Sequence, residues 1–591
     1  MLRTSTLALA LSALAAPASA SELELDFGGR IQSNIRYRPD DKSVGAWYDR
    51  TDQKSEFVRN EHILKLKVNA GYDRFQGVVD ADFVWTGFTR SQDLEDLSFR
   101  ETVEPNRLEA HSAYLEGSDV FVEGLDLRVG QQIVSWGVAD QFNPTNNLNA
   151  DDLEDRLLFG VQQANLMARA DYTVEDWFTF SGVLVPLFKP ALLPKSAAVG
   201  LKSTDRLPMV DAALRRRIHS EQGYAGLNDY PTLIQGTELA LPEPTWRNMQ
   251  FSFRLAFNLG EHDVALSYYN GRSDIPLPVS NTLVQTMDPR CDPNNDADCI
   301  AGSLDTRVTL TYPHIQVAGL NMAGEADLLG WISDDISPLG YRFELGVYFP
   351  SEYRIEVQQG AVSLMGFEVP AREYDYNGPS VDGSGERPVV LSDRPYAKWT
   401  LGVDYTFDEH WYVNAMWVHG LADEVGAGDW MGGDKKVRQG GLREFLPSEF
   451  TTESPDARSY VLNNCANPLN PDGTKCAREV LRNSIGDYLV LGVDFKWSGG
   501  DGLFRVFTIW DLTGYVEDTY DPLQRQRVET KWSPVSKEGF SLVIFPELNY
   551  NFGGGFELGA GALAQLGRRY TKFGDPAAGG SLIWTRARYS F

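Results

Sequence analysis

The sequence predicts an all-β fold, a transmembrane antiparallel β-barrel of about 18 strands. Three observations carry this prediction. The chain begins with an export signal, most of the rest alternates apolar with polar residues, and the joins between alternating segments are short and long in turn. A count of about 16 is the alternative, because segment 306–325 contains Pro313 and segment 502–514 alternates weakly.

The composition excludes several other classes of protein. The 591 residues include 54 Lys and Arg against 82 Asp and Glu, a net charge of −28 that disfavours nucleic acid as a partner. After the N-terminus, no run reaches the roughly 18 apolar residues of a membrane-spanning helix. Aromatic residues at 12% and 54 glycines favour strands joined by turns.

Residues 1–20 have the pattern of a secretory signal peptide. Arg3 supplies the positive start, residues 7–14 the short apolar core, and Ala18 to Ala20 a cleavage site of small residues. The alternative, a buried N-terminal helix, is disfavoured by the abrupt change to the polar sequence SELELDF. We therefore expect the chain to leave the cytoplasm, with residues 21–591 forming a single barrel.

The last strand also favours a membrane barrel. Segment 580–591 alternates and stops on Phe591. A terminal aromatic residue on such a strand resembles bacterial outer-membrane barrels, in which it is part of the signal read by the barrel-insertion machinery. A soluble sandwich could end in the same way, but the combination with an export signal predicts an integral protein of the Gram-negative outer membrane. Its expected partners are outer-membrane lipids, lipopolysaccharide and that machinery.

The alternation has two readings, a soluble β-sandwich and a membrane barrel. In segment 62–72, for example, Leu64 and Leu66 share one face, and Lys65 and Lys67 share the other. The segments are longer than the 5–6 residues usual in soluble sheets, and about 9–11 residues cross a bilayer. This length favours the barrel. The predicted strands are 23–37, 62–72, 75–88, 107–116, 125–137, 164–173, 177–188, 248–259, 262–272, 306–325, 341–350, 395–407, 410–421, 486–497, 502–514, 539–552, 555–568 and 580–591.

The joins between these strands fall into two classes. Short joins such as 73–74 and 553–554 alternate with long joins such as 189–247 and 422–485. Outer-membrane barrels have short periplasmic turns and long extracellular loops. We therefore expect both chain termini in the periplasm and the long loops outside the cell.

Charged residues of both signs lie on the faces opposite the apolar ones, where a hydrated lumen would receive them. On strands 107–116 and 125–137 they form a ladder that could also hold an acid–base site, but lumen lining is the favoured interpretation. The predicted pore-lining residues are Lys65, Lys67, Asp80, Asp82, Arg107, Glu109, His111, Asp126, Arg128, Lys398, Asp404, Asp494, Lys496, Arg586 and Arg588.

Two close cysteine pairs lie in predicted external loops, Cys291 with Cys299 and Cys465 with Cys476. In an exported protein these spacings favour a local disulfide in each loop, each adding up to ~3 kcal/mol of stability, and thiol ligation of a metal is the alternative. Between the first pair, oxygen ligands alternate in a way that could hold calcium, although a solvated polar loop also fits. These candidate ligands are Asp292, Asn294, Asp296 and Asp298.

Segment 127–155 is the most distinctive passage of the sequence. A strand that ends on Trp136 and Gly137 is followed by the Asn143-Pro144-Thr145 turn and by Asp151 and Asp152. This pattern resembles uncharacterised Gram-negative outer-membrane barrels that are similar to distant alginate-export-type porins. Gln131 and Asn146 depart from that pattern, where a basic residue and Asp are common.

The resemblance implies an outer-membrane location and passage of material through the barrel. Two interpretations of this passage stay open. Asn143 could set a turn and Asp151 cap a short helix, or Asn143, Asp151 and Asp152 could belong to a constriction loop that folds into the lumen.

A second candidate for the constriction is the long loop 189–247, where Arg215, Arg216 and Arg217 follow one another. Folded into the mouth, these side chains would favour anions. An exposed basic turn is the alternative.

Candidates for catalysis are few. The chain has seven His, and it shows no serine elbow, HExxH or glycine-rich phosphate loop, so the sequence predicts no enzyme and no cofactor other than possible calcium. The predicted function is passive passage of small hydrophilic or amphiphilic solutes, or of an exported polymer. The alternative is a structural or adhesive surface protein that acts through disulfide-pinned acidic loops. The sequence leaves the solute and the oligomeric state open.

Overall fold

A computed structural model describes most of the chain. The described residues are 23–39, 55–86, 106–153, 160–193, 233–286, 303–327, 338–354, 356–359, 362–364, 367–369, 372–375, 378–379, 389–425, 436–438, 478–483, 485–521, 526–568, 571–574 and 580–591. In these ranges the molecule consists of strands, loops and short 3-10 turns such as Trp246–Asn248 (η3) and Ser498–Gly500 (η6). No helix in the described ranges is long and apolar enough to cross a bilayer.

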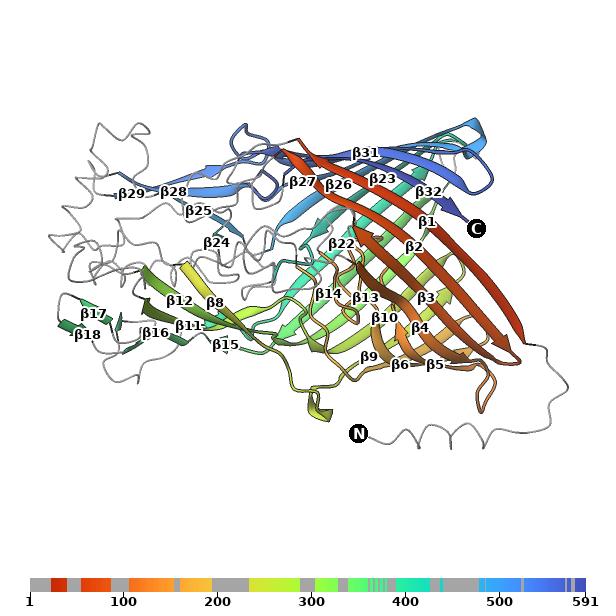
Figure 1. Ribbon diagram of the computed structural model, residues 1–591, viewed down its shortest axis with the longest axis horizontal. Coiled ribbons are helices and arrows are strands. Elements are labelled where there is room, and N and C mark those ends of the chain that lie inside the picture. Colours follow the sequence, from red (N-terminus) through yellow and green to blue (C-terminus); the bar gives the residue numbers. More distant parts are fainter. Residues whose placement is uncertain are drawn as a thin grey trace.

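Eighteen strands form one closed antiparallel sheet, which confirms the predicted barrel (Figure 1). In chain order they are β1 (Glu24–Arg38), β2 (Glu56–Tyr72), β3 (Phe75–Thr86), β4 (Asn106–Gly117), β5 (Leu125–Gln132), β6 (Asn165–Val174), β7 (Phe178–Val185), β9 (Gln250–Leu259), β10 (His262–Arg272), β13 (His314–Ala326), β14 (Leu339–Pro350), β22 (Tyr396–Thr406), β23 (Trp411–His419), β26 (Asp487–Trp497), β27 (Gly502–Asp511), β30 (Ser541–Asn551), β31 (Phe556–Gly567) and β32 (Leu582–Ser590). Each pairs with the barrel strands before and after it in the chain.

The first and last strands close the ring. β1 pairs with β32 from Arg30 opposite Ser590 to Tyr37 opposite Ile583. Next to the Arg30–Ser590 pair, Gly29 and Phe591 exchange two backbone hydrogen bonds of 3.0 Å. A Cβ on Gly29 would lie 2.7 Å from Cζ of the Phe591 ring, so the glycine makes room for the terminal aromatic residue. A role of Phe591 in insertion stays a prediction.

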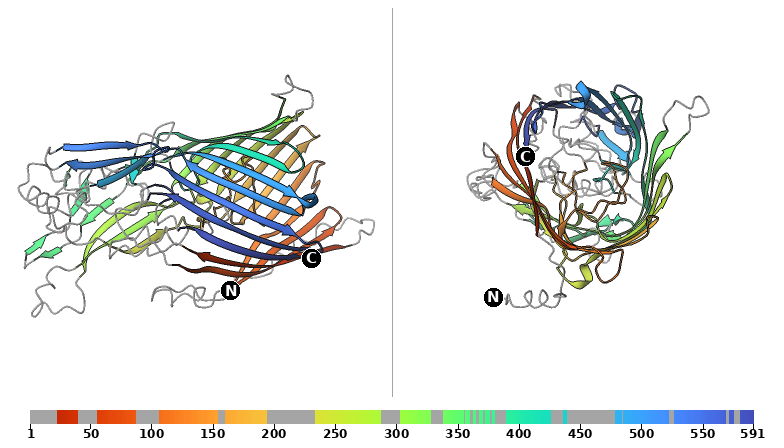
Figure 2. Two further views of the ribbon diagram at one scale, coloured as in Figure 1. Left: turned by 90° about the horizontal axis from the view of Figure 1, so that it is seen from above. Right: turned by 90° about the vertical axis from the view of Figure 1, so that its right-hand side faces the viewer.

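Short and long joins alternate around the barrel. The short joins are residues 73–74, 118–124, 175–177, 260–261, 327–338, 407–410, 498–501 and 552–555. The strand ends that they connect lie at one end of the barrel, here called the short-turn end. Glu24 and Ser590 lie there too, since Glu24 pairs with Gly71 and the Ser590 N–H bonds to the Gly555 carbonyl (2.9 Å) (Figure 2). The opposite end is called the long-loop end.

The long joins carry strands of their own, where the sequence predicts only loops. A six-stranded sheet contains β8 (Leu233–Ala240), β11 (Leu277–Thr286), β12 (Ser303–Thr311), β16 (Glu356–Gln359), β19 (Arg372–Asp375) and β20 (Gly378–Pro379). A four-stranded sheet contains β24 (Lys436–Arg438), β25 (Arg478–Asn483), β28 (Tyr515–Asp521) and β29 (Gln526–Trp532), and two pairs contain β15 (Tyr353–Arg354) with β21 (Val389–Leu391) and β17 (Val362–Leu364) with β18 (Phe367–Val369). Both larger sheets join strands from different loops, so the barrel brings their partners together (Figure 1).

Several strand boundaries differ from the prediction, and two of the differences have a clear physical cause. Segment 306–325 is two strands, because Pro313 has no backbone N–H to donate and separates β12 from β13. β5 ends at Gln132, so Trp136 is not on the strand. The strand stops because the N–H of Val134 bonds to Oδ1 of Asn149 (2.8 Å) instead of a neighbouring strand.

The two faces of the wall have opposite characters. On β22, Leu401 is 45% exposed on the outside, while Thr400 and Lys398 are 0% and 5% exposed on the inside. The apolar face therefore points outward and the polar face points inward. A soluble sandwich would show the reverse, with its apolar face buried.

Candidate functional site

The segment that follows β5 enters the lumen and crosses it. We call residues 133–153 the crossing segment. It leaves the wall at β5, contacts the inner faces of β13, β14 and β22, and stacks Phe142 on Phe507 of β27 with a centroid distance of 6.4 Å. β27 lies far around the ring from β5, with nine barrel strands between them on one route and seven on the other. The segment therefore spans the interior, as the view along the barrel shows (Figure 2).

One buried carboxylate accepts four of the hydrogen bonds that hold the middle of this segment. Oε1 of Glu344 on β14 accepts from the backbone N–H of Thr145 (2.9 Å) and from its hydroxyl (2.7 Å). Oε2 accepts from the N–H groups of Val138 (2.9 Å) and Ala139 (3.3 Å). The Glu344 side chain is completely buried. Backbone and hydroxyl donors thus satisfy this charge.

Neighbouring wall residues bond to the same segment. The amide of Asn321 on β13 donates to the Trp136 carbonyl (2.7 Å), and the hydroxyl of Thr400 on β22 donates to the Phe142 carbonyl (2.7 Å). Asn321, Glu344 and Thr400 lie directly opposite one another on adjacent strands. We call this transverse set the anchor row.

Glycines beside the anchor row allow the segment to lie against the wall. Gly319 and Gly346 face each other on β13 and β14. A Cβ on Gly346 would lie 2.9 Å from the Pro144 carbonyl oxygen, and a Cβ on Gly319 would lie 2.8 Å from Cγ2 of Thr145. The missing side chains therefore provide the space that Pro144 and Thr145 occupy.

Within the segment, Asn143 and Asn149 fold the backbone. Oδ1 of Asn143 accepts from the Ala139 N–H (2.9 Å), and its amide donates to the Asp140 carbonyl. The amide of Asn149 donates to the carbonyls of Gln132 (3.1 Å) and Gln163 (2.9 Å). Asn143 thus does set a turn, and that turn lies inside the barrel.

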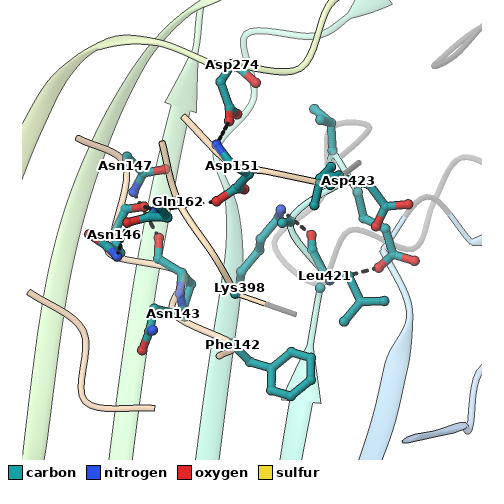
Figure 3. A pocket seen from close by; sticks show the side chains of 18 of the residues that line it. Phe142, Asn143, Asn146, Asn147, Asp151, Gln162, Asp274, Lys398, Leu421 and Asp423 are labelled. Carbon is teal, nitrogen blue, oxygen red and sulfur yellow. Dashed lines mark hydrogen bonds between the residues drawn. The ribbon is translucent and has the colours of Figure 1, made fainter. Parts of the chain in front are cut away.

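A cavity of about 340 Å³ opens beside the crossing segment (Figure 3). We call it the central cavity. Its walls come from the crossing segment, residues 272–274, residues 420–425 and residues 572–573, together with Tyr348 and Tyr396. Its charged lining residues are Asp151, Asp152, Asp274, Asp423, Glu424, Arg272, Lys398 and Lys572. Apolar and aromatic residues share the lining with these charges.

Lys398 projects its ammonium group into this charged surrounding. It donates to the Leu421 carbonyl (2.7 Å) and lies 5.5 Å from the centre of the Tyr348 ring. Lys572 pairs with Asp423 (2.9 Å) and Glu424 (3.2 Å). The 420–425 and 571–574 segments are thereby linked at the edge of the cavity.

Asp151 and Asp274 form a buried carboxyl pair. The N–H of Asp151 donates to Oδ2 of Asp274 (2.8 Å), and Gln162 donates to Oδ1 of Asp151 (3.3 Å). Burial, and then the charge of Asp274, raises the pKa of Asp151 to about 8. Burial raises the pKa of Asp274 as well. One of the two carboxyls therefore holds a proton near neutral pH.

The structure places every predicted pore-lining residue on a barrel strand, and most of them form ion pairs. The pairs are Lys65 with Asp80 (3.0 Å) and Asp82 (3.9 Å), Arg107 with Glu61 (3.1 Å) and Glu109, Arg128 with Glu116 (2.9 Å), Asp404 with Arg342 (2.8 Å), Asp494 with Arg505 (2.6 Å), Arg586 with Glu547 (2.9 Å), and Arg588 with Glu557. Nε2 of His111 lies 3.1 Å from Oδ2 of Asp82. Asp126 accepts a backbone hydrogen bond from Asp119 (3.1 Å). Lys67 and Lys496 are exposed, and Lys398 lines the central cavity.

A bulge interrupts the predicted alternation on β4. The register with β3 shifts between Asp80 and Ala81, opposite residues 110–112. The positions of Arg107 and Glu109 are therefore out of phase with the rest of the strand, and His111 sits at the irregularity. A period of two cannot reveal such a shift.

Several predicted site residues lie outside the described residues. They are the signal peptide, Arg215 to Arg217, the cysteines Cys291, Cys299, Cys465 and Cys476, and the candidate calcium ligands Asp292, Asn294, Asp296 and Asp298. Within the described ranges, no group of three or more His, Cys, Asp or Glu is arranged to hold a metal ion. The disulfides, the calcium site and the adhesive alternative stay predictions.

Sequence reasoning missed the wall residues that hold the crossing segment and most of the cavity. Glu344 is the one charged residue in the apolar stretch FELGVYF. A lone charge there indicates that its side chain points into the lumen, but it does not indicate which residue the side chain bonds to. Asp274, Asp423 and Lys572 lie in joins, where period-two alternation does not apply. Their proximity depends on how four separate segments meet.

No protein-family model and no curated protein matches this sequence. Solved structures with a similar layout include OccK9 (OpdG) of Pseudomonas aeruginosa, at 7% identity and a TM-score of 0.43 over 96% of this chain and 98% of that chain. OccAB1 of Acinetobacter baumannii has 6% identity and a TM-score of 0.41 over 96% of this chain and 96% of that chain. The outer membrane channel DcaP of Acinetobacter baumannii has 8% identity and a TM-score of 0.33 over 98% of this chain and 100% of that chain. These values do not establish a shared family, so the resemblance of segment 127–155 to alginate-export-type porins stays a prediction.

Proposed function

We propose that the protein is an integral outer-membrane channel for the passive passage of small hydrophilic or amphiphilic solutes. One observation carries the proposal: a closed 18-stranded barrel whose outer face is apolar and whose inner face is charged. In barrels of 16–18 strands the lumen is too wide for wall side chains alone to fill, and an aqueous channel remains.

The outer face supports a membrane location. Large apolar side chains are exposed on strands all around the barrel. Monomeric soluble proteins rarely expose such an extended apolar surface, whereas lipid would cover it in a membrane. Examples on successive parts of the ring are Ile31, Phe83, Leu115, Val129, Phe253, Leu266, Leu401, Leu491, Leu548 and Leu558.

The interior supports small solutes over a polymer. The crossing segment runs through the lumen, and an extended polymer would have to pass beside it or displace it. The central cavity, at about 340 Å³, is within the usual size range of small-molecule sites. Its mixture of charges, amides and aromatic rings suits solutes that carry both polar and apolar groups.

The test is electrical and osmotic. The full-length mature chain, refolded and inserted into planar bilayers, should give stepwise conductance increases, and in liposomes it should admit solutes up to a defined size. Liposomes without protein and the heat-unfolded chain serve as controls. A folded, inserted barrel without conductance and without swelling would contradict the proposal.

The membrane location needs its own experiment. In a Gram-negative host the chain should fractionate with the outer membrane and should migrate faster on a denaturing gel before heating than after it. Recovery of folded protein from the soluble periplasmic extract would contradict a membrane location.

A further inference from the structure

The crossing segment is held to the wall at a compact set of contacts. The anchor row supplies hydrogen bonds to Trp136, Val138, Ala139, Phe142 and Thr145. Nearby, the Tyr348 hydroxyl donates to the Pro144 carbonyl (2.6 Å). All of these contacts come from β13, β14 and β22, three neighbouring strands of the barrel.

Glu344 is the centre of this set. It is the middle residue of the anchor row, it is fully buried, and it accepts four hydrogen bonds from two separate parts of the segment, residues 138–139 and residue 145. A buried carboxylate needs its donors, since a charge without hydrogen bonds is strongly disfavoured in such a place. The segment therefore supplies the hydrogen-bond donors that the buried Glu344 needs, and Glu344 in turn holds the segment against the wall.

We infer that Glu344 is the positioning residue of the channel: it holds the crossing segment across the lumen, and the segment, not the barrel wall, sets the size limit for solutes. This inference rests on the proposed function. Glu344 acts through the segment, because its carboxylate is covered and a passing solute would not touch it.

The chemistry of the two oxygens gives a graded test. Oε1 accepts hydrogen bonds from Thr145, and Oε2 accepts hydrogen bonds from Val138 and Ala139. In Glu344→Gln, one oxygen remains an acceptor and the other position becomes a donor facing a donor. Glu344→Ala loses both sets of contacts. Conductance should therefore increase from wild type to Glu344→Gln and further to Glu344→Ala. The conductance of Glu344→Ala should be at least about twofold that of wild type.

Glu547 on β30 offers a matched control. It is a lumen carboxylate that pairs with Arg586, and none of its contacts involves the crossing segment. Glu547→Ala changes the lumen charge by the same amount as Glu344→Ala. We expect Glu547→Ala to change ion selectivity only, whereas Glu344→Ala should also admit larger solutes in liposome swelling.

A second comparison separates positioning from a merely structural role. Replacing residues 138–147 by a short Gly-Ser linker should raise conductance by itself, and adding Glu344→Ala to that variant should change it no further. All variants must show the heat-modifiable migration of a folded barrel. Conducting Glu344 variants with the wild-type size limit, or an equal effect of Glu547→Ala, would overturn the inference. A silent but folded wild-type barrel would instead overturn the proposed function.

Discussion

The inner wall of the barrel has two regions that treat polar groups differently. On the ladder wall, formed by β30, β31 and β32, charges pair with each other, as Arg586 does with Glu547 across 39 sequence positions. On the anchoring wall, formed by β13, β14 and β22, Glu344 finds its partner Thr145 199 positions away, in the crossing segment. The Arg586–Glu547 pair of the ladder wall forms without the segment, whereas the hydrogen bonds of Glu344 on the anchoring wall come from it.

This difference has an energetic side. Arg586 and Glu547 keep about a quarter of their side-chain surface exposed, so water screens their attraction. Glu344 has no exposed surface, and each lost donor leaves part of a buried charge unsatisfied. Substitutions on the anchoring wall should therefore change both the segment and the channel, while those on the ladder wall should change little but local charge.

The largest effect should come from filling the glycine space on the anchoring wall. Gly346→Val would place side-chain atoms where the Pro144 carbonyl lies 2.9 Å from a Cβ, so the segment must move and conductance should rise by about twofold or more. Gly492→Val on β26 is the matched control, because the nearest atoms to its Cβ are 3.9 Å away. Single-channel recording of both variants makes the comparison, and equal conductance changes would count against a segment held by close packing.

The next effect is a pH dependence that involves the carboxyl pair. Asp151 has its pKa raised from 3.8 to about 8, so protonation favours the packed position of the segment. Its contribution is complete below about pH 4, the ordinary pKa range of a carboxyl, and is lost as pH rises through about 8. The charges near it are Asp274, Asp423 and Lys398.

We therefore expect wild-type conductance, or amide hydrogen exchange in the segment, to increase between pH 6 and pH 9, about one unit or more to each side of the transition. Asp151→Asn cannot ionise and should give a nearly flat profile across the same interval. An unchanged slope in Asp151→Asn would assign the pH dependence to other groups.

A smaller effect should follow the loss of one anchor hydrogen bond. Thr400→Val keeps the shape of the side chain but removes the hydroxyl that donates to the Phe142 carbonyl. The segment should lose about 1 kcal/mol of holding free energy, and its amide exchange should become faster while the barrel strands stay protected. Thr585→Val on the outer face of β32 is the control, with no change expected in the segment.

The smallest effect should be on the ladder wall. Arg586→Ala removes a partly exposed ion pair with Glu547, and the free energy of unfolding in urea should fall by about 0.5–1 kcal/mol. The solute size limit should stay at the wild-type value. A larger pore in Arg586→Ala would mean that the two walls are coupled through the lumen.

Much of the wall could be predicted from the sequence because each strand carries its own alternation. Lys65 and Asp82 lie opposite one another simply because β2 and β3 are joined by the tight turn at 73–74. The ends of the strands are harder to predict from the sequence. β5 ends at Gln132 because the Val134 N–H donates to Asn149, and nothing at positions 133–137 predicts that contact.

The candidate site could be predicted only in part. The sequence drew attention to Asn143, Asp151 and Asp152, and two open interpretations followed. It gave no indication of Asp274 beside Asp151 or of Glu344 beneath Thr145, because these partners lie on joins and strands far along the chain.

The sequence by itself determined the closed barrel, its apolar outside and its charged inside, because period-two alternation and neighbouring strand pairs are local properties. The tertiary structure alone decided that residues 133–153 run through the lumen and meet Glu344, Asp274 and Lys398 there. The physical reason is closure: only when β1 meets β32 do distant strands face a common interior, and only then can one segment satisfy buried groups from several of them.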